Sequence, residues 1–178
     1  MVLCGIATDA SSTGAGVTRA PISYSMSSDL ASLAPLPLLS RASDNHPATL
    51  ASITPALHPA VSERIAHLQP FLATLPPWKV VAAFRWAHSE HINALEARAA
   101  GTALRFAASR PSFIASSLLL LSDSVAVVGA LAKGRSSSPA LRLPIRSVQA
   151  LCLAASIRLY PIWLHTTINP ADEPSRWC

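Results

Sequence analysis

The chain has 178 residues, enough for one domain with its own core and too few for two comfortable ones. Its 14 basic and 9 acidic residues give a formal charge of +5, which favours polyanionic partners. Although 51% of the residues are hydrophobic, the most apolar run, Leu118–Leu121, is far shorter than the roughly 20 residues of a membrane-spanning helix, so no membrane segment is predicted.

The first elements expected are two strands and a long arm. Residues 2–8 alternate weakly and lead into a polar, glycine-containing stretch, which indicates a strand, a tight turn and a returning strand. Residues 19–59 are rich in Ser, Ala, Leu and Pro, and their prolines prevent long regular elements. We therefore predict an irregular arm inserted after the first strands, wrapping over the surface or contacting a partner.

The middle of the chain predicts a helix, a strand and a second helix. Residues 61–75 show helical spacing up to Pro76 and Pro77. Residues 78–86 are rich in β-formers and indicate a strand. Residues 93–109 again carry apolar side chains at helical spacing, and Arg110–Pro111 closes that helix.

The last third predicts strand, helix, helix and strand. Residues 116–121 form a continuous apolar run, typical of a strand buried on both faces. A helix is expected from Asp123 to Lys133, ended by Gly134. A further helix over 139–156 precedes a strand over 157–164 and a short helical piece within 169–177.

The helix over 139–156 is amphipathic in the sequence. Its apolar face is expected to contain Leu143, Val148, Leu151 and Leu153, with Pro144 in the first turn. The whole order of elements predicts an α/β fold with a mixed sheet, in a single domain over residues 1–178.

The N-terminus and the cysteines bear on the compartment. Met1–Ala7 contains no basic residue and resembles neither a secretory signal nor a transit peptide. The three cysteines, Cys4, Cys152 and Cys178, are widely spaced and suggest neither a disulfide framework nor a CxxC metal site. We expect an intracellular protein, nuclear or cytoplasmic with an organelle left open, and a core position for Cys152.

Four of the nine acidic residues fall at expected strand ends or helix starts: Asp9, Glu96, Asp123 and Asp172. Acids placed in this way can share Mg²⁺, a hard cation that prefers oxygen ligands. Two such ions about 4 Å apart can activate a water and stabilise the leaving oxygen in phosphodiester cleavage. This chemistry requires no His or Cys ligand.

Each acid also has a purely structural interpretation. Asp9 could form an Asx-turn at the strand end. Glu96 stands three residues after Asn93, which fits a capping box. Asp123, between two serines, fits a helix N-cap, and Asp172 could cap the terminal helical piece.

The local contexts of the four acids resemble ribonuclease H domains of the retroelement reverse-transcriptase type. The most specific matches are the segment His91–Ala99 around the second acid and Asn169–Arg176 around the fourth. The resemblance covers residues 1–18 and 78–176, and it extends to the domains of retroelements that integrate with a tyrosine recombinase. The other matching segments are Thr8–Ser11 followed by Gly14, Leu121–Ser124, Gly129–Gly134 and Trp163–Leu164.

The resemblance implies a ribonuclease H-like fold, a five-stranded mixed sheet flanked by helices, and cleavage of the RNA strand in an RNA–DNA hybrid. Its implied catalytic and metal-binding residues are the four acids, which would hold two Mg²⁺ or Mn²⁺ ions. It further implies contacts of Ser11 and Asn93 with the hybrid backbone or its 2′-hydroxyls, and an auxiliary role for His165.

Two other classes of function stay open on the sequence. The chain could be a catalytically silent, domesticated module that binds nucleic acid or a larger assembly, contacted through the 19–59 arm. The low charged fraction of 13% and the apolar arm favour this alternative. Other members of the ribonuclease H superfamily fit less well, since proofreading exonucleases place Asp-x-Glu on the first strand and integrases use three acids.

Overall fold

The computed structural model describes residues 3–22 and 77–177. The helix expected over 61–75 lies outside these residues, as does the arm from residue 23 onwards. Within the described ranges, no helix is long and apolar enough to cross a membrane.

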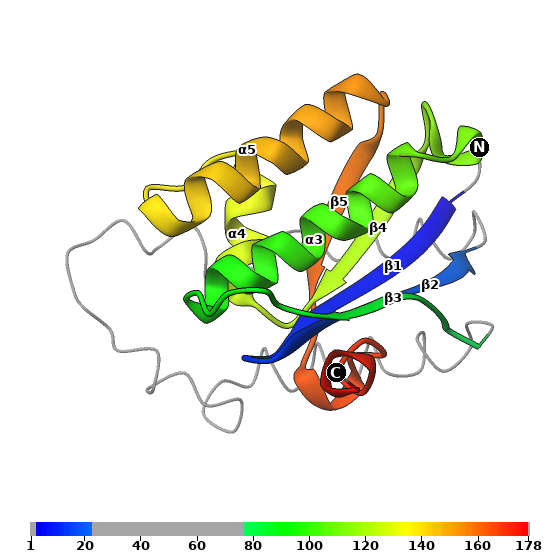
Figure 1. Ribbon diagram of the computed structural model, residues 1–178. Helices are drawn as coiled ribbons and strands as arrows, with labels where there is room; N and C mark the ends of the chain where they lie inside the picture. The colour runs from blue at the N-terminus through cyan, green and yellow to red at the C-terminus, as the bar shows by residue number, and fades with distance from the viewer. Residues whose placement is uncertain (1–2, 23–76, 178) are drawn as a thin grey trace, which may run out of the picture.

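A five-stranded mixed sheet forms the centre of the fold, with strand order β3-β2-β1-β4-β5 (Figure 1). The first three strands are antiparallel, whereas β4 and β5 run parallel to β1. This arrangement confirms the predicted fold class. The strands are β1 Leu3–Ala10, β2 Gly14–Ile22, β3 Lys79–Arg85, β4 Ser117–Ser122 and β5 Arg158–Trp163.

Strand β2 is longer than predicted. It continues to Ile22, so residues 19–22, which the sequence assigned to the arm, belong to the sheet. Pro21 is tolerated there because the pairing of β2 with β3 ends at Arg19 and Lys79. Beyond that point a residue without an N–H removes no bond to β3, the usual condition for proline in a sheet.

Three helices cover one face of the sheet (Figure 1). They are α3 Ile92–Ala108, α4 Val125–Lys133 and α5 Pro139–Ala154. Their apolar sides pack with Ile6, Leu118 and Leu120 of the sheet in the main core. Every residue of β4 is buried, which confirms the interpretation of its apolar run.

Helix α5 differs from the prediction in two respects. Pro144 lies beyond the first turn, because the helix already begins at Pro139. Leu143 and Leu153 are 71% and 80% exposed, so their assignment to the apolar face was wrong. The buried face consists of Leu141, Ile145, Val148 and Cys152, and the last of these confirms the core position expected for that cysteine.

The segment after β5 returns to the opposite face of the sheet (Figure 1). It contains two short 3-10 helices, η5 Thr166–Ile168 and η6 Pro174–Arg176, and Ala171 between them joins the apolar cluster on that face. We call residues 169–176 the closing segment. The side-chain amide of Asn169 donates to the carbonyl of Thr8 at 3.1 Å, which fixes the closing segment to β1.

Candidate active site

Three carboxylates from distant parts of the chain meet at one end of the sheet. They belong to Asp9 in β1, Glu96 in α3 and Asp123 after β4, and one oxygen of each lies within 4.8 Å of those of the other two. The parallel register explains the meeting of the two aspartates. Thr8 pairs with Ser122, so the next residue of each chain segment emerges at the same edge.

Glu96 turns into the protein and does not cap its helix. The N-cap of α3 is His91, whose Nδ1 accepts from the backbone N–H of Asn93, so the capping-box interpretation was wrong. Glu96 is 6% exposed, and its Oε1 accepts from the backbone N–H of Ala10 at 3.2 Å. Its Oε2 is buried without a hydrogen-bond partner in the described part of the chain. A buried carboxylate oxygen left free in this way suits a cation.

Asp123 is also free of the capping role. The hydroxyl of Ser124 accepts from the N–H of Val127 and caps α4, so the N-cap interpretation of Asp123 was wrong. The backbone of Asp123 is held instead, because the indole N–H of Trp163 donates to its carbonyl at 2.8 Å. The side chain is therefore available to the carboxylate cluster.

Asp9 sits inside β1, paired with Gly16, and is 5% exposed. The turn that follows is closed by Ser11, whose hydroxyl accepts from the N–H of Gly14 at 2.9 Å, so the Asx-turn interpretation of Asp9 was wrong. One oxygen of Asp9, Oδ2, accepts from the hydroxyl of Ser175 at 2.5 Å.

Asp172 lies beside the cluster without being one of its three members. Its Oδ1 forms an ion pair with Arg176 at 2.8 Å, and its charge raises the pKa of Asp9. The residue in the cap position of η6 is Glu173, so the cap interpretation of Asp172 was wrong. Solvent screens an exposed ion pair of this kind and makes its contribution to stability small, so the carboxylate of Asp172 stays available to a cation.

Burial and mutual repulsion oppose the ionisation of two of the acids. Desolvation, together with the charges of Asp123 and Asp9, raises the pKa of Glu96 to about 9. Desolvation also raises the pKa of Asp9 to about 6, although the hydrogen bond from Ser175 acts in the opposite direction. A divalent cation would relieve this repulsion, and the all-oxygen donor set suits Mg²⁺ or Mn²⁺. The residues present therefore fit a metal site.

These pKa values predict that the metal-free protein loses stability as the pH rises. Both acids bind a proton more tightly when folded, so the stabilisation is complete below about pH 4 and is lost as the pH passes about 6 for Asp9 and about 9 for Glu96. We expect the free energy of unfolding to fall by about 2–4 kcal/mol between pH 5 and pH 8. Urea denaturation in EDTA measures this change.

Glu96→Gln is the control for the pH dependence. The amide is neutral at every pH, so the variant should lose most of the dependence and be the more stable protein at pH 8. A wild-type free energy of unfolding that stays constant from pH 5 to pH 8 would contradict the assignment of a buried, proton-holding Glu96.

The remaining sequence candidates occupy different positions around the cluster. Ser11 uses its hydroxyl within the turn and also donates to the carbonyl of Ser175 at 3.0 Å. Asn93 is half-buried in the first turn of α3. His165 caps η5, and its Nδ1 lies 2.9 Å from the hydroxyl of Thr167, while its ring meets Trp163 edge-on. The structure therefore gives Ser11 and His165 local structural contacts.

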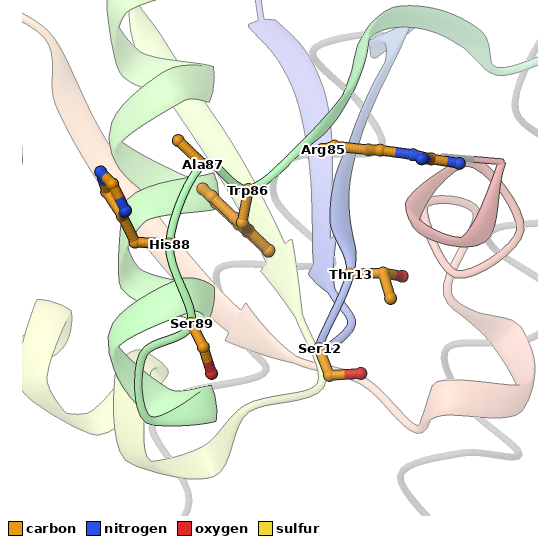
Figure 2. A pocket seen from close by; sticks show the side chains of 7 residues that line it. All are labelled: Ser12, Thr13, Arg85, Trp86, Ala87, His88 and Ser89. Carbon is orange, nitrogen blue, oxygen red and sulfur yellow. The ribbon is translucent and has the colours of Figure 1, made fainter.

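A pocket of about 420 Å³ opens beside the β1–β2 turn (Figure 2). Figure 2 shows its lining coming from that turn, from the end of β3 and from the segment that connects β3 to α3. Sequence reasoning did not identify this pocket, since its two walls lie more than seventy positions apart in the chain. The lining residues are Ser12, Thr13, Arg85, Trp86, Ala87, His88 and Ser89.

Comparison with known proteins supports the fold. No protein-family model matches the sequence, and no curated protein matches it. The solved structures similar to it include three RNase H proteins or domains. RNase H1 from the halophilic archaeon Halobacterium salinarum shares 14% identity at a TM-score of 0.49, with 97% of this chain and 92% of that chain covered.

The other two structures give slightly higher TM-scores. The N-terminal RNase H domain of a Mycobacterium tuberculosis protein, solved as a fusion with maltose-binding protein, has a TM-score of 0.52 at 16% identity and covers 98% of this chain and 94% of that chain. LC11-RNase H1 in complex with an RNA/DNA hybrid also has a TM-score of 0.52, at 10% identity, with 97% and 92% covered.

The strand order and the comparisons together define the fold class of this protein. Its sheet order and flanking helices form a ribonuclease H-like α/β fold, in agreement with the two structures of higher TM-score. At one end of that sheet lie three carboxylates that could bind a metal. Because the identities are low, the similarity establishes the fold, and the activity must be argued from the site.

Proposed function

We propose that this protein is a metal-dependent endonuclease that cleaves the RNA strand of RNA–DNA hybrids, derived from a retroelement of the reverse-transcriptase type. The observation that carries the proposal is the meeting of Asp9, Glu96 and Asp123 within 4.8 Å. Asp172, next to them in the closing segment, is proposed as the fourth acid. The sequence resemblance in the segments around all four residues supports the retroelement origin.

Asp9, Glu96 and Asp123 would hold the metal ions, with Asp172 completing a second site. Two Mg²⁺ or Mn²⁺ ions would supply activation of the attacking water and stabilisation of the leaving oxygen. The protein's own part is to hold these carboxylates in place before any cation arrives. The N–H of Ala10 orients the carboxylate of Glu96, and the indole of Trp163 holds the backbone that carries Asp123.

The hybrid would lie across the end of the sheet, over the pocket beside the β1–β2 turn. Arg85 and His88 in the lining can contact phosphate, and Ser12 and Thr13 can contact sugar hydroxyls. Asn93 and Ser11 are proposed as further contacts with the hybrid, and His165 as an auxiliary residue in turnover. Since Ser11 already closes the turn, its contribution would be to shape the turn that the hybrid touches.

A cleavage assay tests the proposed function. The purified chain is incubated with an end-labelled RNA–DNA hybrid, with single-stranded RNA, or with duplex DNA, in Mg²⁺, Mn²⁺ or EDTA. The proposal expects internal cuts in the RNA of the hybrid alone and none in EDTA. Intact folding without cleavage at any metal concentration would refute it.

The second candidate is a silent module that binds nucleic acid or a larger assembly without cleaving. The ion pair between Asp172 and Arg176 favours it, because a guanidinium bound to the fourth acid competes with a cation there. The exposed setting of that pair makes the competition weak, so we favour the enzyme. If the protein bound both metal and the hybrid but did not cleave the RNA, the silent module would be the correct assignment.

A further inference from the structure

Ser175 is a buried hydroxyl between two of the acidic residues. The residue is 0% exposed, and its Oγ lies 2.5 Å from Oδ2 of Asp9 and 2.8 Å from the backbone carbonyl oxygen of Asp172. A hydroxyl has one hydrogen, so it donates to one of these oxygens at a time. The carboxylate of Asp9 is the stronger acceptor, because hydrogen bonds to an ionised group are shorter and stronger than neutral ones.

The backbone of Ser175 is held by hydrogen bonds within the closing segment and to residues near Asp9. The N–H of Ser175 donates to the carbonyl of Ala171, and its own carbonyl accepts from the hydroxyl of Ser11. Asn169, at the start of the closing segment, donates to Thr8, the residue before Asp9. These hydrogen bonds therefore fix the position of the Ser175 hydroxyl relative to Asp9.

The three acidic residues of the cluster are held by different contacts. The carboxylate of Glu96 accepts from a backbone N–H and Trp163 holds the backbone of Asp123, whereas Oδ2 of Asp9 accepts from the hydroxyl of Ser175. With Oδ2 bound to Ser175, the carboxylate cannot rotate freely, so its other oxygen keeps a fixed direction. Partners that orient metal ligands in this way commonly set metal affinity.

We propose that Ser175 is a positioning residue that fixes the carboxylate of Asp9 for divalent-cation binding. The inference rests on the proposed function in one respect, namely that the carboxylate cluster binds a cation. It does not require that the chain cleaves a hybrid.

The test is calorimetric titration of Mn²⁺ into the whole chain at pH 7.5, without nucleic acid. Ser175→Ala should weaken Mn²⁺ binding about 10–100-fold, the usual cost of losing such a partner. Ser175→Cys, which keeps a similar size and a weak donor, should fall between wild type and Ser175→Ala. If the alanine variant does not fold, the cysteine variant decides alone.

Ser116→Ala is the matched control. Ser116 is 5% exposed and its hydroxyl donates to the carbonyl of Phe113 at 2.6 Å, away from the carboxylate cluster. This variant should lose thermal stability as Ser175→Ala does, yet bind Mn²⁺ as the wild type does. A role of Ser175 in stability alone would leave the Mn²⁺ affinities of the two alanine variants equal.

The outcomes separate this inference from the proposed function. Wild-type affinity for Mn²⁺ in Ser175→Ala, an equal weakening in Ser116→Ala, or no Mn²⁺ binding by the wild type would each overturn the role of Ser175. A wild type that binds Mn²⁺ in a Ser175-dependent manner but cleaves no hybrid would refute the proposed function and support the positioning role. In an active protein, Ser175→Ala should raise the half-saturating Mn²⁺ concentration more than it lowers the maximal rate.

Discussion

Asp123→Asn is expected to abolish cleavage of the RNA–DNA hybrid while leaving the fold intact. The substitution removes a proposed metal ligand, and loss of even an outer-shell partner costs about 10–100-fold. We therefore expect a loss of more than about 100-fold in the cleavage rate at saturating Mg²⁺, measured with the end-labelled hybrid.

The fold should tolerate this change because the side chain of Asp123 has no structural task. Ser124 caps α4, and Trp163 bonds to the backbone carbonyl of residue 123, which asparagine keeps. Removing one negative charge also relieves the repulsion that raises the pKa of Glu96. The metal-free variant should accordingly be as stable as the wild type at pH 8, or more so, in urea denaturation.

Glu173→Gln is the matched control for Asp123→Asn. Glu173 is an exposed acid of the closing segment, so its neutralisation changes the net charge by the same amount outside the cluster. This variant should cleave at the wild-type rate. If Asp123→Asn also cleaved at that rate, the carboxylate cluster would not be the catalytic site.

The sheet and the identity of the clustered acids could be predicted because the signals are local. The apolar run at residues 118–121 has the length of a buried strand, and an acid directly after such a strand must emerge at its carboxyl end. With β1 and β4 parallel and adjacent, Asp9 and Asp123 then share one edge. The residues around each acid carried the rest of the prediction.

The direction in which a side chain points could not be predicted in the same way. The spacing of Asn93 and Glu96 fits a capping box and an inward carboxylate equally well, and only the packing of α3 against β1 decides between them. In α5, leucines occur on several sides of the helix, so the buried face depends on how the helix meets α3. Leu143 and Leu153 were misassigned for this reason.

Side-chain contacts between distant segments could not be predicted from the sequence. Ser175 and Asp9 stand 166 positions apart, and no spacing rule connects a serine near the C-terminus with an acid near the N-terminus. The indole of Trp163 reaching the carbonyl of Asp123 is a similar case. The family resemblance marked the closing segment as important without indicating what its serine touches.

Gly16→Ala is expected to displace the closing segment from the sheet. A Cβ at this position would lie 2.5 Å from the carbonyl oxygen of Ala171 and 2.6 Å from the backbone nitrogen of Ser175. Both are backbone atoms of the closing segment, so no flexible side chain can move aside. We expect a loss of about 1–3 kcal/mol or more in the free energy of unfolding, as for other overpacked sites.

Gly101→Ala provides a control of opposite sign. Gly101 lies within α3, and a Cβ there would meet only Arg105 and Val148 at the ordinary distance of 3.9 Å. Alanine in a helix restricts the unfolded chain without strain in the folded one, so this variant should be stabilised by about 0.4–1 kcal/mol. Urea denaturation of both variants measures the difference.

Gly16→Ala should also affect the carboxylate cluster, because the closing segment contains Ser175 and Asp172. Displacing it would separate Ser175 from Asp9 and move Asp172 away from the cluster, so Gly16→Ala should raise the half-saturating Mn²⁺ concentration for cleavage as well as lower the stability. Gly101→Ala should change neither the Mn²⁺ requirement nor the rate. If Gly16→Ala were as stable as the wild type and as responsive to Mn²⁺, the close packing of the closing segment against β2 would be wrong. The role of this segment as the support of Asp9 would then be wrong as well.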